Sequence, residues 1–294
     1  MTPSSQTPFA ELPPAGTAAA TQTDAVDLHL LGQPFRVHGD TAVVGEVRRL
    51  LDVFVVSPAQ PADPPVVTVR RLADGYAVTA TGQPDAGGHA YNAVDATTLV
   101  LAILNAAALS GAGCLAVHAG VVARNGRAVA FPAESGQGKS TLTAACLRAG
   151  LDYVSDEALC LDWRDARVLP YPRPLELSGW SRAAVGLPAG PCDRLVTAEG
   201  LGAKPARSPL VLDHLVLLAR HADADAATVT LEPVPRQQGA AALLVRSFNH
   251  WRDPERAFDL AHEVAARTRV WRLRLGDPGR AATLLSTLLP GAVS

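Results

Sequence analysis

One stretch of the chain, residues 131–142, has the pattern of a phosphate-binding loop. An apolar segment before it predicts a strand and a helical pattern follows it, which is the order in which such loops work. Backbone N–H groups of the loop and of the helix start would point inward and attract phosphate. The residues predicted to bind a nucleotide are Glu134, Ser135, Gly136, Gln137, Gly138, Lys139, Ser140 and Thr141.

The use of lysine separates a phosphate site from a chance glycine-rich turn. The usual loop begins with glycine, and Ala133 takes that place in this chain. Of the 26 lysines and arginines, only Lys139 and Lys204 are lysine. A compact ammonium fits between phosphate oxygens where a forked guanidinium fits poorly, so the lysine favours the phosphate site. Lys139 would reach the β- and γ-phosphates, and the Ser140 hydroxyl would ligate Mg²⁺.

The composition limits what the protein binds and where it works. A formal net charge of −2 does not mark a nucleic-acid binder. Segment 99–117 is uncharged, but polar residues and glycines interrupt it, so we expect a buried helix and a strand and no membrane span. No signal peptide is visible, because the first basic residue is Arg36. The cysteines lack metal-ligand spacing and predict reduced thiols in a cytoplasmic protein: Cys114, Cys146, Cys160 and Cys192.

Hydrophobic periodicity predicts an α/β (α+β) chain. We expect a disordered leader at 1–25, an N-terminal α+β region at 26–110 and a larger domain around the phosphate loop at 111–294. Helices are expected at 43–53, 95–109 (capped by Asp95), 139–149, 178–185, 237–248, 254–266 and 278–289. Strands are expected as hairpins at 27–38, 66–81, 115–131 and 158–171, and at 210–219 with 227–234 as its partner and at 270–275. A long, mobile loop is expected at 186–208.

Three further features accompany the loop. Asp156 and Glu157 follow the strand after the loop's helix, where carboxylates can hold Mg²⁺ or take a proton; a solvated turn is the alternative. His118 lies in an apolar strand, and a lone histidine there is more often a core residue than a catalytic one. Arg173 stands between prolines that would hold it for a phosphate, although an ordinary surface arginine is slightly favoured from the sequence.

Three blocks together resemble the kinase core of the HPr kinase/phosphatase family. They are Val117-His-Ala-Gly-Val-Val122, Pro132-Ala-Glu-Ser-Gly-Gln-Gly-Lys-Ser-Thr141 and Tyr153-Val-Ser-Asp-Glu157. That family pairs a histidine-glycine strand, an E-S-G-x-G-K-S loop and an acidic doublet after the loop's helix. The resemblance covers about residues 112–177, and the rest of the chain only in general layout.

The resemblance implies a fold and a set of roles. The fold would be a compact α/β core related to phosphoenolpyruvate carboxykinase, different from the Ras and RecA types. Asp156 would be the general base, Glu157 would assist the metal, and His118 would orient or relay near the acidic pair. Lys139 and Ser140 would hold phosphate and Mg²⁺.

The chain also departs from the family. Glu157 stands where the family usually has aspartate, and Ala133 replaces the first loop glycine. The family's downstream arginine segment, associated with dephosphorylation, has no match, and the N-terminal third does not resemble its regulatory domain. The chain therefore resembles a stand-alone relative, and some such relatives are tailoring enzymes that phosphorylate ribosomally made peptides.

The sequence predicts an ATP- and Mg²⁺-dependent kinase that phosphorylates a hydroxyl, first of all a serine on a peptide or protein. The alternatives are a small-molecule alcohol kinase and an ATP-binding regulatory module that transfers nothing. The acceptor is expected near residues 170–174, with 186–208 as a lid. We expect no nucleic-acid or membrane partner, and homo-oligomer formation is left open.

Overall fold

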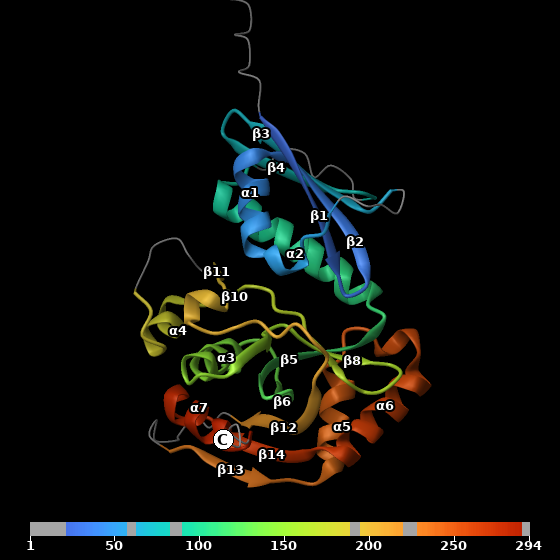
Figure 1. Cartoon of the computed structure of the whole chain (residues 1–294), viewed down its shortest axis with the longest axis vertical. Coiled ribbons are helices and arrows are strands. Elements are labelled where there is room, and N and C mark those ends of the chain that lie inside the picture. The colour runs from blue at the N-terminus through green and yellow to red at the C-terminus, as the bar shows by residue number, and fades with distance from the viewer. Residues whose placement is uncertain (1–21, 58–62, 83–89, 189–194, 220–227, 290–294) are drawn as a thin grey trace, which may run out of the picture.

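The computed structural model describes residues 22–57, 63–82, 90–188, 195–219 and 228–289. These residues form a mixed α/β fold with seven helices and several mixed sheets, drawn in Figure 1. Most of the leader predicted at 1–25 lies outside the described residues. Its last part is not disordered, because the first strand begins at Thr23. The strand starts earlier than the sequence indicated because Thr23, Asp24 and Ala25 pair with residues 38–40 of the neighbouring strand.

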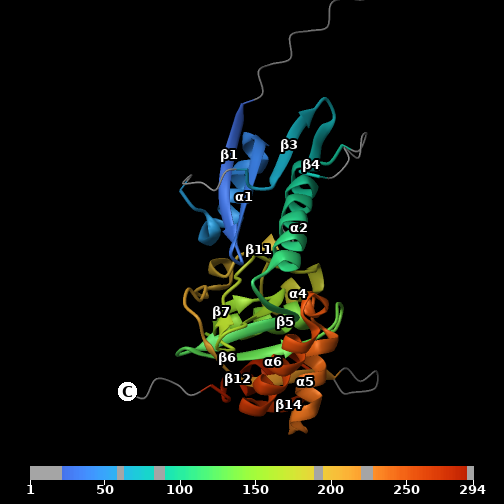
Figure 2. The same cartoon turned by 90° about the vertical axis from the view of Figure 1, so that its right-hand side faces the viewer.

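The N-terminal part is a four-stranded sheet covered by two helices (Figure 2). Its strand order is β1-β2-β3-β4, with β2 and β3 parallel and the outer pairs antiparallel. Helix α1 connects the parallel strands, as such a pair requires. The elements are β1 (Thr23–Leu30), β2 (Gln33–Asp40), α1 (Thr41–Leu50), β3 (Val66–Leu72), β4 (Gly75–Ala80) and α2 (Ala93–Gly111).

Helix α2 is the one described helix whose length and composition would let it cross a membrane. It is instead the core helix of the N-terminal part, with Val100, Leu101 and Leu104 buried. Its cap is Asn92, whose side chain accepts from the backbone N–H of Asp95 at 2.9 Å. The predicted cap at Asp95 was therefore wrong by one turn, because Asn92, three residues earlier, accepts from the free backbone N–H of Asp95 itself.

The second part is built on a larger sheet with the order β13-β14-β12-β6-β5-β8-β9, and β7 pairs with β5. Strands β6, β12 and β14 are parallel neighbours, and the others are antiparallel. The strands are β5 (Cys114–Arg124), β6 (Arg127–Pro132), β7 (Asp152–Ser155), β8 (Ala158–Asp162), β9 (Val168–Leu169), β12 (Val211–Ala219), β13 (Thr230–Pro233) and β14 (Arg269–Arg274). Asn125 and Gly126 both have positive φ and close the predicted β5–β6 hairpin.

Helices cover both faces of this sheet (Figure 1). Helices α3 (Lys139–Arg148) and α7 (Pro278–Ser286) share one apolar core with residues of β6, β12 and β14. Helices α5 (Arg236–Val245) and α6 (Pro254–Arg267) pack on the opposite face. A short helix, α4 (Gly179–Ala184), contacts α3. The phosphate loop thus connects the end of β6 in this sheet to α3 on one of its faces.

Strand β5 changes its partners along its length, and this organises the domain. Its first half, Cys114 to His118, pairs with β8, and residues 121–123 pair with β7. On the other side its second half pairs with β6, while the first half is bonded to residues 246–249. All these changes fall at residues 118–121, so four segments of the chain meet there.

The predicted pairing of one strand in the C-terminal half was wrong. Segment 227–234 was expected to pair with β12, but its strand β13 pairs with β14. Helices α5 and α6 form the long crossover that makes β12 and β14 parallel neighbours, which leaves β13 at the sheet edge.

The loop expected at 186–208 is largely ordered where it is described, and residues 189–194 lie outside the described part. Strand β11 (Leu195–Val196) pairs with β10 (Leu175–Glu176), and Leu201 is buried. Further along, the backbone N–H of Tyr153 donates to the carbonyl of Lys204 at 2.8 Å. The apolar residues of this segment dock it onto the core, so its Gly/Pro content does not make residues 195–208 a mobile lid.

A buried histidine ties the end of the chain to the sheet. The indole N–H of Trp271 on β14 donates to His214 Nδ1 on β12 at 3.0 Å. Nε2 of His214 therefore carries the hydrogen and donates to the carbonyl of Leu288 at 3.1 Å. Protonation of Nδ1 would break the bond from Trp271.

We expect this histidine to make stability depend on pH. Burial lowers the pKa of His214 most, Arg269 and Arg127 lower it further, and the Leu288 carbonyl and Asp213 raise it. The folded state then binds fewer protons than the unfolded state below about pH 6.5, so stability is full above that pH and falls as the pH decreases. Urea unfolding of wild type and His214→Asn between pH 5 and 8 checks this. The variant should show the shallower slope, and equal slopes would contradict the assignment.

Candidate functional site

The phosphate loop has the backbone that its glycines predicted. Gly136 and Gly138 have φ of 81° and 91°, in the left-handed region that favours glycine. Gly138 is the N-cap of α3, so the free N–H groups of the first helical turn face the loop. Ala133, in place of the usual glycine, is fully buried with a negative φ. The alanine therefore costs no backbone strain at this position.

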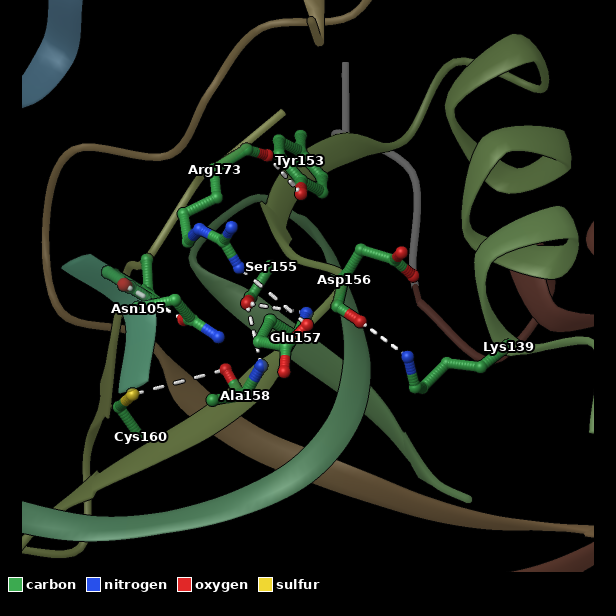
Figure 3. A network of polar contacts seen from close by, with 10 residues as sticks. Asn105, Lys139, Tyr153, Ser155, Asp156, Glu157, Ala158, Cys160 and Arg173 are labelled. Carbon is green, nitrogen blue, oxygen red and sulfur yellow. Dashed lines mark hydrogen bonds and ion pairs between the residues drawn. The ribbon is translucent and has the colours of Figure 1, made fainter. Parts of the chain in front are cut away.

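Lys139 lies at the start of α3 and is 8% exposed. Its ammonium donates to the backbone carbonyl of Asp156 at 2.7 Å, as Figure 3 shows. The hydrogen bond holds the side chain across the mouth of the loop. A buried ammonium at a helix N-terminus, beside free N–H groups, is a strong site for an anion.

The acidic doublet forms the turn between β7 and β8, and Ser155 shapes that turn. The Ser155 hydroxyl accepts from the backbone N–H groups of Glu157 and Ala158 at 3.2 and 3.0 Å. Asp156 then faces α3, where Thr143 donates to its carboxylate at 2.9 Å. Glu157 faces away from α3 toward Arg173. The two carboxylates therefore occupy different surroundings.

Burial raises the pKa of the Asp156 carboxyl above its ordinary value. The charge of Lys139 and hydrogen bonds from Ser140 and Thr143 oppose this shift, while Glu157 adds to it. A buried carboxylate with a raised pKa and a nearby cation differs from the carboxylate of a solvated turn, and groups perturbed in this way cluster at functional sites. The alternative of a plain surface turn thus does not describe Asp156.

Arg173 is not the ordinary surface arginine that the sequence slightly favoured. Its side chain is 14% exposed, and its Nη1 lies 3.7 Å from Glu157 Oε2. The hydroxyl of Tyr153 donates to the Arg173 carbonyl at 2.5 Å and fixes this backbone. Arg173 is thereby held beside the acidic turn, and the flanking prolines were the only sequence signal of its placement.

His118 lies opposite Ala158 in the β5–β8 pair, next to the acidic turn. Burial lowers its pKa most, the charges of Lys139 and Arg246 lower it further, and Glu157 and Glu134 raise it. Its ring packs against Phe248 with centroids 5.5 Å apart. The structure therefore favours a neutral imidazole at the edge of the site.

Arg246 is a site neighbour that the sequence did not reveal. Its carbonyl accepts from the His118 N–H at 2.8 Å, because residues 246–249 run along β5. The buried Nε atom of Arg246 has no hydrogen-bond partner among the described residues. No motif marks this arginine, and only the pairing of β5 with a segment more than a hundred residues away brings it here.

The phosphate loop, the acidic turn, His118 and Arg173 line one cleft of about 940 Å³. The predicted residues that line it are His118, Glu134, Ser135, Gly136, Gly138, Lys139, Ser140, Thr141, Asp156 and Glu157. Gln137 does not line it, because its side-chain oxygen accepts from the Glu134 N–H at 3.1 Å. The sequence missed further lining residues, among them Thr98, Leu101 and Ala102 of α2, Trp180 and Ser181 of α4, and Leu195. The cleft thus lies between the two parts of the chain.

The oxygen groups of the cleft fit a magnesium ion. Ser140, Asp156 and Glu157 all line the cleft, so a hydroxyl and two carboxyl groups are available there together. No group of three metal-binding side chains occurs within the described residues. Mg²⁺ usually takes only one or two carboxylates, and phosphate and water supply the rest. The predicted ligands Ser140 and Glu157 both line the cleft.

No family model matches the chain, and no curated protein matches it. The described cysteines Cys114, Cys146 and Cys160 are free and buried, as expected for core thiols, and Cys192 lies outside the described part.

We expect Gly120 to be required for the close packing of β5 against α3. A Cβ at this position would lie 2.6 Å from Thr143 Oγ1 and overlap the ring of Phe131. Gly120→Ala should lower the unfolding free energy by about 1–3 kcal/mol, because it overpacks the contact between β5 and α3. Urea unfolding measures this loss.

Gly113→Ala is the matched control, since nothing lies within 4 Å of its Cβ position. It should change the unfolding free energy by less than about 0.5 kcal/mol. Equal stability of the two variants would show that the packing of α3 on β5 does not require glycine at position 120.

Proposed function

We propose that this protein is an ATP- and Mg²⁺-dependent kinase that transfers the γ-phosphoryl group to a hydroxyl of a peptide or protein. The observation that carries the proposal is the convergence of Lys139 and the buried Asp156 at the N-terminus of α3. A glycine loop followed by this helix suits a polyphosphate. A binding module needs only the loop, so the buried carboxylate favours an enzyme over a regulator.

The residues divide into those that bind phosphate and those that handle the proton. The N–H groups around Gly136 to Ser140 and the Lys139 ammonium would hold the β- and γ-phosphates. Bound Mg²⁺ would neutralise phosphate charge, held by the Ser140 hydroxyl and a carboxylate of the acidic turn. Arg173 lies close enough to the turn to balance its negative charge.

Asp156 would act as the general base. Its carboxylate takes the proton of the acceptor hydroxyl while the oxygen bonds to the γ-phosphorus and the bond to the β-phosphate oxygen breaks. The raised pKa brings its basicity closer to neutral pH. His118, held neutral, would orient the acceptor or the acidic turn from β5.

The size of the cleft supports a large acceptor. Its volume of about 940 Å³ is at the upper end for small-molecule sites, and helix α2 forms one wall. A nucleotide would fill the part next to the loop, and the remainder is room for a chain segment. We therefore propose a peptide or protein acceptor, as in the HPr kinase-like family that the motifs resemble, in the cytoplasm where ATP is supplied.

We expect binding and transfer to separate between two variants. Lys139→Ala should lose Mg·ATP affinity by at least tenfold, because the phosphates lose their buried cation. Asp156→Asn should bind Mg·ATP within a few-fold of wild type and lose transfer by about 10²-fold or more, because an amide cannot take the proton. Titration calorimetry and mass spectrometry of a candidate peptide measure the two quantities.

Lys204→Ala is the control for the lysine variant, since Lys204 is the chain's other lysine and is exposed. It should leave both quantities unchanged. Unchanged ATP affinity in Lys139→Ala would refute the phosphate site. Wild-type binding without transfer to any peptide or small alcohol would favour the regulatory module, and faster transfer to a small alcohol would favour that substrate class.

A further inference from the structure

Helix α4 is attached to the phosphate-loop helix through a chain of hydroxyl groups. Thr141 Oγ1, in the first turn of α3, lies 2.8 Å from Ser181 Oγ, and both residues are buried. Ser181 Oγ lies 2.9 Å from the hydroxyl of Ser178, the N-cap of α4, which also accepts from the Ser181 N–H at 3.1 Å. The position of α4 is therefore set directly by the loop.

Helix geometry puts α4 on the side of α3 away from the proposed base. Lys139 and Thr143 are four residues apart, share one face of α3 and both contact Asp156. Thr141 lies midway between them, so its side chain leaves the opposite face, toward Ser181. Because the acceptor would approach the γ-phosphate on the Asp156 side, the nucleoside end of a bound nucleotide would extend toward α4.

Trp180 is placed to meet that end. It precedes Ser181 in α4, lines the cleft and is 64% exposed. Leu195 of β11 also lines the cleft. A tryptophan so exposed leaves much apolar area in water, which is unfavourable without a ligand or partner. Its backbone is nevertheless fixed by the hydroxyl chain, so the ring stands on a rigid support.

We propose that Trp180 is the stacking surface for the nucleobase of the bound nucleotide. The inference rests on the proposed nucleotide site and adds the residue that recognises the base. Stacking on an aromatic ring is tolerant of base identity, because every base has a π face. The site should then bind ATP and GTP with similar affinity.

The test compares a nucleotide with its phosphate chain alone. Titration calorimetry would measure the Kd of Mg·ATP and of Mg·tripolyphosphate for wild type, Trp180→Ala and Trp180→Phe. Trp180→Ala should weaken ATP by about tenfold or more, since base stacking is worth about that much, and leave tripolyphosphate within twofold. Trp180→Phe should recover most of the ATP affinity.

Trp251→Ala is the matched control. Trp251 lies in the turn His250–Arg252, is 65% exposed, and is not among the described residues that line the cleft. It should leave both dissociation constants unchanged. A proportional loss for the two ligands in Trp180→Ala, or no loss at all, would overturn the stacking role. If wild type bound neither ATP nor tripolyphosphate, the nucleotide site itself would fail, and the stacking role with it.

Discussion

The site depends on one constraint, which is that strand β5 exchanges its pairing partners at residues 118–121. At this point the phosphate loop leaves β6, with Ala133 donating to the carbonyl of His118 at 3.3 Å. The acidic turn joins β7 to β8 on the opposite edge, and Ala119 donates to the carbonyl of Glu157 at 3.3 Å. Main-chain bonds thus bring segments that are distant in sequence together at this point. The functional side chains thus stand on rigid backbone rather than on free loops.

This arrangement places a carboxylate and an ammonium in a buried site, where desolvation makes both charges unfavourable. Asp156 is buried, its pKa is raised by that burial, and Lys139 compensates with its charge and a bond to the backbone carbonyl. A charge pair held in this way adds little to stability, because desolvation offsets the attraction. A bound phosphate and a metal ion would offset this desolvation cost, because they place opposite charges beside Lys139 and Asp156. Gly120 allows the close packing that keeps Thr143 on Asp156.

Local signals in the sequence predicted much of the fold but not its long-range pairings. The β5–β6 hairpin, α3 and the acidic turn follow from neighbouring residues, such as Asn125-Gly126 and the loop glycines. Arg246 could not be predicted, because only β5 pairing with a distant segment places it. Trp180 could not be predicted either, because its exposure follows from the docking of α4 on Thr141. The predicted pairing of β13 with β12 was wrong for the same reason, because local hydrophobic periodicity does not show which strands a crossover connection makes neighbours.

A structure of the protein with Mg²⁺ and a non-hydrolysable ATP analogue tests the central claim most directly. We expect the β- and γ-phosphates on the N–H groups of residues 136–140, with the Lys139 ammonium moved from the Asp156 carbonyl to phosphate oxygen. The Asp156 carboxylate should then face the γ-phosphorus from the side opposite the leaving oxygen. Phosphates bound away from the loop, or a Lys139 that keeps its bond to Asp156 while the γ-phosphate lies elsewhere, would contradict it.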